Sequence, residues 1–140
     1  MDDYAALLPN EIRLASPTNF EAFISRLEPL DQRIVIRAIR DLLQPFGLAL
    51  LDEGWLKDLG ADLYEFRVGP TRRKVLRRTI QNEADFFDSE LLVRIFCTFV
   101  SETEIVILHF YDKTHDRTRS TQKSAIEAAR NILDSTGGLS

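Results

Sequence analysis

Two apolar runs in the second half of the chain alternate as the strands of a β-hairpin do. Residues 91–113 read LLVRIFCTFVSETEIVILHFYDK, and the polar tetrad 101–104 separates the two runs. Val, Ile and Phe are enriched in strands, and a polar turn between two such runs is typical of a hairpin. The pattern therefore predicts two antiparallel strands centred on residues 101–104.

Antiparallel pairing about this turn predicts two faces of different character. The apolar face is expected to consist of Phe99 with Val106, Cys97 with Leu108 and Ile95 with Phe110. The mixed face is expected to consist of Thr98 with Ile107, Phe96 with His109 and Arg94 with Tyr111. A slip of one residue would mix the faces, so the pattern itself specifies the register. We expect the apolar face to bury a core and the mixed face to stay partly open, with Arg94, His109 and Tyr111 close together.

The beginning of the chain predicts a short strand followed by a helix. Residues 3–8 favour a short helical turn, and residues 11–15 alternate as a strand that Pro17 ends. Thr18 or Asn19 is a suitable N-cap for the segment NFEAFISRL, whose apolar residues recur at helical spacing.

A second helix is predicted from about Leu30 to Leu43, ending at residues 44–47, where Pro and Gly stop it. Its apolar stripe is expected to consist of Ile36, Ile39 and Leu43, widened by Val35 and Leu42. Residues 48–61 are interpreted as a connector. The next strand, residues 62–68, is expected to send its aromatic side chains to the core and Arg67 to the mixed face.

A last helix is predicted over about residues 122–134, capped by Ser120 or Thr121 and followed by Gly137 and Gly138. Its apolar stripe is expected to consist of Ala125, Ile126, Ala129, Ile132 and Leu133. The order of elements indicates an α+β fold, in which an N-terminal helical pair and a C-terminal helix pack on one face of a small antiparallel sheet. A length of 140 residues fits a single domain spanning 1–140.

The composition is that of an ordinary globular protein, with 44% hydrophobic and 29% charged residues and a net charge of −4. No apolar run approaches the roughly 20 residues of a membrane span, and the acidic N-terminus does not read as a signal peptide. We therefore expect a cytoplasmic protein. The single cysteine, Cys97, excludes an internal disulfide and a cysteine zinc cluster, and we interpret it as a small buried hydrophobe.

Positive charge is concentrated in one stretch. Residues 54–80 carry seven basic and three acidic side chains, whereas residues 81–111 carry one basic and six acidic. Five of the basic residues are Arg72, Arg73, Lys74, Arg77 and Arg78. They belong to a charged segment at about 70–90 that is expected to be an insertion in the domain and to which the pattern assigns no structure. This run is either a local contact for nucleic acid or a solvated loop.

Several kinds of site are excluded or disfavoured. The chain has no phosphate-binding loop and no GxGxxG. His109 and His115 are its two histidines, so an HExxH motif is absent, and nothing in their spacing asks for a metal site. Cys97 and His109 are expected on opposite faces, which disfavours a nucleophilic pair. Neighbouring carboxylates are interpreted as solvated charges, namely Asp52 with Glu53 and Asp85 with Asp88.

What remains is a set of cations and proton-transfer groups expected on the mixed face. It consists of Lys57, Arg67, Arg94, His109, Tyr111 and Lys113. A single arginine at mid-strand usually makes an ordinary surface ion pair. Two arginines with a tyrosine and a histidine favour an anion-binding site, and the alternative is a polar sheet face that is solvated or covered by a partner.

The order of these motifs resembles the RelE/ParE toxin superfamily of type II toxin-antitoxin systems, and most of all its HigB-like, phage-derived branch. The resemblance rests on LKDLGADLYEFRV, then LLVRIFCTFV, then IVILHFYDKTHDRT leading into SAIEAARNIL, and it covers about residues 55–134. It implies a RelE-like fold and a ribosome-dependent mRNA endonuclease that inhibits translation and growth. The implied partners are mRNA, the ribosome and a cognate antitoxin with a helix-turn-helix, in a bacterial cytoplasm. The resemblance implies no cofactor and no metal ion, because the ribose 2′-OH attacks the adjacent phosphodiester.

Carried over position by position, the resemblance assigns Arg67 and Arg94 to the scissile phosphate, whose shape matches the guanidinium fork. Tyr111 or His109 would transfer protons, and histidine has the more suitable intrinsic pKa. Lys57 and Lys113 would position RNA or stabilise charge. The basic run, Arg72, Arg73, Lys74, Arg77 and Arg78, would add RNA contacts.

Two features depart from the family. These toxins are usually basic, and the segment between the two arginine strands is longer than the usual turn. The alternatives are therefore a non-nucleolytic inhibitor of DNA gyrase, of the ParE kind, and a phage-derived adaptor or structural protein that shares the fold.

Overall fold

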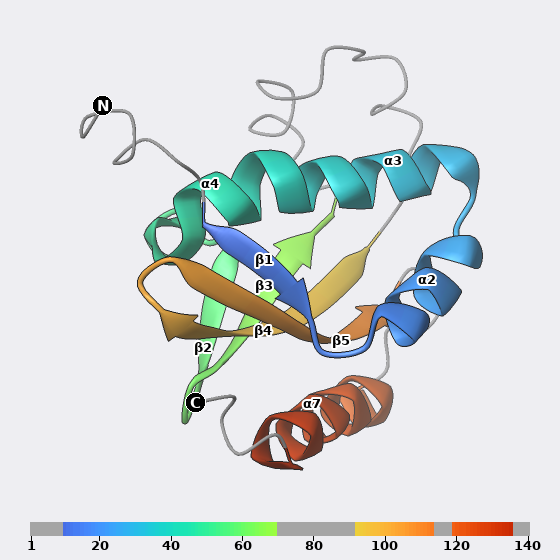
Figure 1. Ribbon diagram of the computed structural model, residues 1–140. Coiled ribbons are helices and arrows are strands. Elements are labelled where there is room, and N and C mark those ends of the chain that lie inside the picture. Colours follow the sequence, from blue (N-terminus) through green and yellow to red (C-terminus); the bar gives the residue numbers. More distant parts are fainter. Residues whose placement is uncertain (1–9, 70–91, 114–118, 136–140) are drawn as a thin grey trace.

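A five-stranded mixed sheet lies between two layers of helix (Figure 1). The computed structural model describes residues 10–69, 92–113 and 119–135. The strands are β1 (Glu11–Leu14), β2 (Leu56–Gly60), β3 (Leu63–Val68), β4 (Val93–Ser101) and β5 (Glu104–Asp112). The helical elements are α2 (Pro17–Ser25), α3 (Pro29–Ala38), the π-helix η1 (Ile39–Leu43), α4 (Gln44–Phe46), the 3₁₀ helix η2 (Gly47–Leu51) and α7 (Arg119–Ser135). The predicted α+β class is confirmed.

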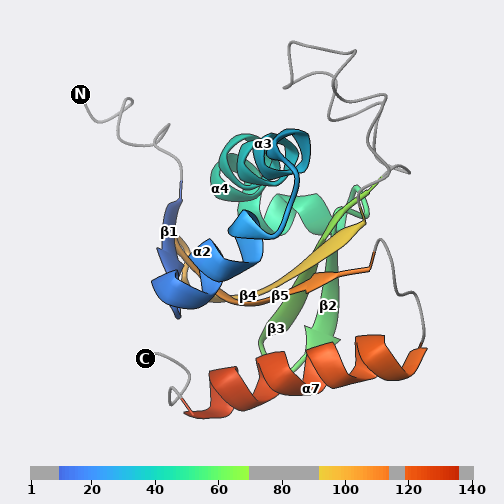
Figure 2. The same ribbon diagram turned by 90° about the vertical axis from the view of Figure 1, so that its right-hand side faces the viewer.

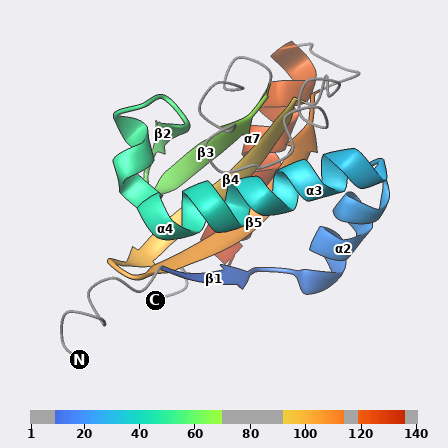
Figure 3. The ribbon, with the colours of Figure 1, turned by 90° about the horizontal axis from the view of Figure 1, so that it is seen from above.

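The strands lie in the order β1-β5-β4-β3-β2. The pairs from β5 to β2 are antiparallel, but β1 runs parallel to β5 beside it (Figure 3). The prediction of an antiparallel sheet was therefore wrong at this edge. Since β1 and β5 are separated by almost 90 residues of sequence, no turn between them marks their relative direction in the pattern.

The rod formed by α3, η1 and α4 covers one face of the sheet (Figure 2). Its buried side chains include Val35, Ala38, Ile39 and Leu42. They pack on Trp55, which precedes β2, and on sheet residues such as Phe66, Ile95, Cys97 and Ile107. Ile36 was predicted in this stripe but is 41% exposed. The helical period running from Val35 leads to Ala38, Ile39 and Leu42, which leaves Ile36 on the outer side.

Helix α7 covers the opposite face, so the helices do not share one face as predicted (Figure 2). Its predicted stripe is confirmed, with Ala125, Ala129 and Leu133 buried against Phe96 and Leu108. Helix α7 therefore covers Phe96 and Tyr111 of the mixed face, whereas Arg94 and His109 stay partly exposed. Val106 and Leu108, which were predicted on the apolar face, lie on the α7 side together with Phe96. Helix α7 removes their apolar area from water, which stabilises the fold by about 25 cal/mol per Å².

The hairpin has the predicted register in one half. Arg94 lies opposite Tyr111, Ile95 opposite Phe110 and Phe96 opposite His109, as expected. Beyond a shift at Phe96 and Cys97, the pairs are Cys97 with Ile107, Thr98 with Val106 and Phe99 with Ile105, one residue away from the prediction. The extra residue on β5 is Leu108, which has no direct partner on β4. The bulge reverses the faces of the residues before it, so Val106 and Leu108 lie on the α7 side and Ile105 and Ile107 on the α3 side, which corrects the predicted faces of this half. Because all four residues are apolar, the sequence pattern did not reveal the bulge.

Strand β2 lies within the stretch that was interpreted as a connector. It pairs with β3 through a turn at Ala61 and Asp62, both of which have positive φ, 48° and 69°. Two positive φ values suit the twist of a tight hairpin, and Asn-Gly is the usual signal for it. Ala-Asp lacks that signal. Arg130 of α7 donates hydrogen bonds to the carbonyls of Leu59, Gly60 and Ala61 and so ties this turn to the helix.

Two helix starts differ from the prediction. The side chain of Ser16 caps α2 by accepting a hydrogen bond from the N–H of Asn19, and Pro17 occupies the first turn, so neither Thr18 nor Asn19 is the cap. Proline suits this position because its missing N–H has no partner there in any helix. Helix α7 begins at Arg119, which places Ser120 and Thr121 inside its first turn.

Several predicted features lie outside the described residues, and no structural statement applies to them. They are the turn at 3–8, Arg72, Arg73, Lys74, Arg77, Arg78, His115, Gly137 and Gly138. In the part of the chain that is described, no helix is both long and apolar enough to cross a membrane.

Candidate functional site

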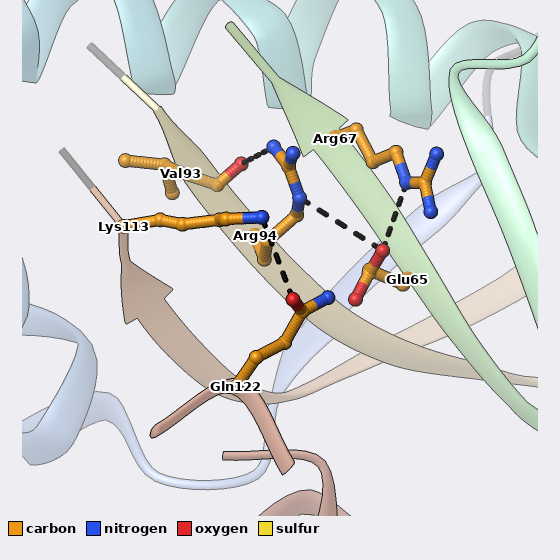
Figure 4. A network of polar contacts seen from close by, with 6 residues as sticks. All are labelled: Glu65, Arg67, Val93, Arg94, Lys113 and Gln122. Carbon is orange, nitrogen blue, oxygen red and sulfur yellow. Dashed lines mark hydrogen bonds and ion pairs between the residues drawn. The ribbon is translucent and has the colours of Figure 1, made fainter. Parts of the chain in front are cut away.

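Arg67 and Arg94 are cross-strand neighbours at the ends of β3 and β4 (Figure 4). Tyr111 of β5 lies opposite Arg94 in the same row. Paired residues on adjacent antiparallel strands project from the same face, so the three side chains share the α7 side of the sheet. The sequence predicted this row, and the structure brings its members together.

The two arginines share one carboxylate, that of Glu65. Arg67 Nε donates to Glu65 Oε1 at 2.8 Å, and Arg94 Nε lies 3.8 Å from the same oxygen (Figure 4). Glu65 is 1% exposed, and among the described residues its second oxygen, Oε2, has no hydrogen-bond partner. A buried charge requires a counter-charge, so the two arginines stabilise the buried carboxylate of Glu65.

The two guanidinium groups differ in access to solvent. The Arg67 side chain is 31% exposed, whereas that of Arg94 is 14% exposed. Arg94 also donates from Nη1 to the carbonyl of Val93 at 3.3 Å. A ligand arriving from solvent therefore contacts Arg67 first, and the more buried Arg94 adds its positive charge to the site.

Two lysines extend the positive charge beside this pair. Lys57 is exposed on β2, directly opposite Glu65. Lys113 follows β5, and its Nζ lies 3.4 Å from Oε1 of Gln122 in α7, which accepts a hydrogen bond from it (Figure 4). The cluster thus collects cations from β2, β3, β4 and the end of β5, with α7 as its border.

His109 lies one step away from the arginine row, opposite Phe96. Its ring is stacked on that of Phe96, with centroids 6.3 Å apart and planes at 19°. Burial lowers the pKa of His109 below its ordinary value, because desolvation disfavours the imidazolium. Tyr111 is 8% exposed. Arg94 and Tyr111 pair directly, as expected, and His109 pairs with Phe96 as the diagonal neighbour of Arg94 while also lying beside residues of α2.

Glu65 and Gln122 are parts of the site that the sequence reasoning did not single out. A signal for Glu65 was available, because it stands two residues before Arg67 and so projects from the same face of the strand. Gln122 had no such signal, since its contact depends on where α7 crosses the sheet.

The chemistry open to this arrangement is the binding of an anion. Two arginines share one buried carboxylate, Lys57 lies opposite that carboxylate and Tyr111 lies opposite Arg94. A guanidinium donates to phosphate or carboxylate oxygens in pairs. Among residues 10–69, 92–113 and 119–135, no three His, Cys, Asp or Glu side chains gather as metal ligands. Comparison of the chain with protein families, with curated proteins and with solved structures found no match.

Proposed function

We propose that the protein is the toxin of a type II toxin-antitoxin system, a ribosome-dependent mRNA endonuclease of the RelE/ParE superfamily. The observation that carries the proposal is the row formed by Arg67, Arg94 and Tyr111 across three adjacent strands. Two arginines beside a phenol are suited to hold a phosphodiester and to move a proton at it. The motif order over residues 55–134, which resembles the HigB-like branch, supports the same reading.

In this mechanism the arginines hold the scissile phosphate. Arg67 is the more exposed and contacts the phosphate oxygens, and Arg94 adds a second positive charge close by. The ribose 2′-oxygen attacks phosphorus and loses its proton to a base, the bond from phosphorus to the 5′-oxygen breaks, and an acid protonates that oxygen. The charge that develops on the phosphate is stabilised by the fixed cations.

Tyr111 is the proton-transfer group nearest to the arginines, because it lies directly opposite Arg94. Lys113 and Lys57 lie on either side, where they stabilise charge or hold the RNA strand. The partners in this proposal are translated mRNA on the ribosome and a cognate antitoxin with a helix-turn-helix, and the setting is the bacterial cytoplasm.

The test is inducible expression in a bacterial host with primer extension on a reporter mRNA. Wild-type protein is expected to arrest growth and to leave cuts inside translated codons. Arg67→Ala and Arg94→Lys are expected to lose both effects, the latter because lysine keeps the charge but not the fork. Arg40→Ala is the matched control, since Arg40 is an exposed arginine on the outer side of the helical rod.

One observation favours a second candidate, a non-nucleolytic inhibitor of DNA gyrase. Tyr111 and the Arg94 side chain are only 8% and 14% exposed. An inhibitor that acts by binding a target does not require these two side chains to reach a phosphate. Growth arrest with intact mRNA and inhibited supercoiling would establish that function. The absence of any arrest would favour the phage-derived adaptor or structural protein.

A further inference from the structure

A second concave site lies at the sheet edge, between α2 and β5. It is a cavity of about 290 Å³ lined by Asn19, Ala22, Phe23, Arg26, His109 and Phe110, which we call the α2–β5 cavity. It arises because β1 stops at Leu14, so that the last part of β5 is flanked by α2 and not by another strand (Figure 3). None of the residues proposed for phosphate binding lines it.

The lining combines aromatic rings with polar groups. Phe23 and Phe110 stack on each other with centroids 4.9 Å apart, which fixes the position of both rings. His109 stacks on Phe96 through one face of its imidazole, so its other face is turned away from that ring. Asn19 is exposed on α2 and Arg26 is exposed at its C-cap. They supply an amide donor, an amide acceptor and a cation.

The cavity is close to the proposed phosphate site. His109 and Tyr111 are two residues apart on β5, which is about 7 Å along a strand. His109 is also the diagonal neighbour of Arg94, since Arg94 pairs with Tyr111 and Phe96 pairs with His109. If the phosphate of one nucleotide lies at Arg67, the base of a neighbouring nucleotide in the same RNA strand can therefore reach this cavity.

We infer that the α2–β5 cavity binds an unstacked nucleobase of the RNA strand whose phosphate is held at Arg67 and Arg94. The inference rests on the proposed function in taking RNA as the ligand. Proteins read single-stranded RNA by stacking splayed-out bases on aromatic, histidine or arginine side chains and by bonding to the base edges. His109 and Arg26 supply the stacking surfaces, Phe23 and Phe110 form an apolar wall, and Asn19 supplies an amide for the edge.

The lining favours a base over the other parts of a nucleotide. One cation among several rings is a poor phosphate site beside the four-cation cluster on the neighbouring strands. Burial keeps His109 neutral at pH 7 by lowering its pKa, so it adds no positive charge there. A flat aromatic ligand with hydrogen-bonding edges matches rings and an amide, and the volume lies near the lower end of small-ligand sites.

The test uses nuclear magnetic resonance titration of the full-length protein with the four nucleoside 5′-monophosphates. Ribose 5-phosphate is the base-free control. At least one nucleotide is expected to shift the resonances of Ala22, Arg26 and His109, and ribose 5-phosphate is expected to leave them in place. If ribose 5-phosphate shifts them equally, or if no nucleotide does, the inference is overturned.

A variant pair localises the binding. Ala22 is exposed on α2 and lines the cavity, so Ala22→Leu places a larger side chain in it without disturbing a core residue. We expect this substitution to weaken nucleotide binding by about tenfold or more, the scale of one lost stacking contact. Glu21→Gln, at the neighbouring exposed position, is the control and is expected to bind like wild type. Equal affinity of Ala22→Leu and wild type contradicts the inference.

The two proposals fail separately. Nucleotide binding at the cavity requires no cleavage. If the protein binds nucleotides there but cuts no mRNA, the cavity inference is supported and the proposed nuclease function is contradicted. If the protein cuts mRNA but the resonances of Ala22 and Arg26 show no base-dependent shift, the nuclease function is supported and the cavity inference is contradicted.

Discussion

Arg67 and Arg94 stand directly opposite each other on adjacent strands, two positive charges in a position where like charges repel. What makes the arrangement stable is Glu65, whose single oxygen Oε1 faces both Nε atoms. The carboxylate of Glu65 is buried, whereas the arginine side chains are partly exposed, so the surface here carries positive charge. This polarity is what an anion site needs, and it makes Glu65 a positioning residue for the cations.

Glu65→Gln removes the counter-charge while keeping the shape of the side chain. We expect the free energy of unfolding to fall by about 1.5–3 kcal/mol, the usual worth of a hydrogen bond to a charged group. The measurement is urea denaturation monitored by circular dichroism, with the exposed Glu21→Gln as control. If the two variants unfold at the same urea concentration, the shared ion pair contributes nothing and the positioning role of Glu65 is refuted.

Ala61→Gly is expected to stabilise the protein. Ala61 has a φ of 48°, a left-handed conformation that a Cβ disfavours. Glycine removes that strain but gives the unfolded chain more freedom, so the net gain is about 0.5–1 kcal/mol. Thermal unfolding would detect it as a higher midpoint. Ala49→Gly, at an exposed position of the helix η2, lacks the strain and is expected to lower the midpoint.

His109 makes stability depend on pH in the acidic range. Its folded pKa lies below its ordinary value of 6.5 because burial disfavours the charged ring. Between those two pKa values the unfolded chain binds more protons than the folded chain, so the free energy of unfolding decreases as pH falls through this range. His109→Gln is expected to reduce this slope, measured by urea unfolding between pH 7 and about pH 5. An unchanged slope would show that His109 titrates alike in both states.

Cys97 is expected to be unreactive in the native protein. It is fully buried in the core beneath α3, and burial raises the pKa of its thiol to about 12. Thiolate is the reacting species, so a thiol-specific chromogenic disulfide should label native protein slowly and urea-unfolded protein rapidly. The chain has one cysteine, so the signal reports this position alone. Native labelling as fast as that of the unfolded chain would contradict the burial.

Local alternation determined the elements that lie close together in the sequence. The hairpin of β4 and β5, the orientation of Arg67 away from the α3 core and the apolar stripe of α7 all follow from periodicity within one segment. The row of Arg67, Arg94 and Tyr111 was accessible for the same reason, because residue spacing and a turn specify which side chains project together. The nucleolytic role assigned to that row remains a prediction.

Tertiary structure alone decided how the segments meet. The parallel docking of β1 on β5 and the covering of the second sheet face by α7 join residues far apart in the chain. The bulge at Leu108 reverses the faces of the residues before it on β5, and no apolar pattern marks it. Glu65 looked like a polar strand residue until α7 and the neighbouring strands enclosed it. Sequence periodicity records which face of a segment avoids water, whereas burial, ion pairing and the α2–β5 cavity depend on which other segment covers that face, and that is set by the packing of the whole chain.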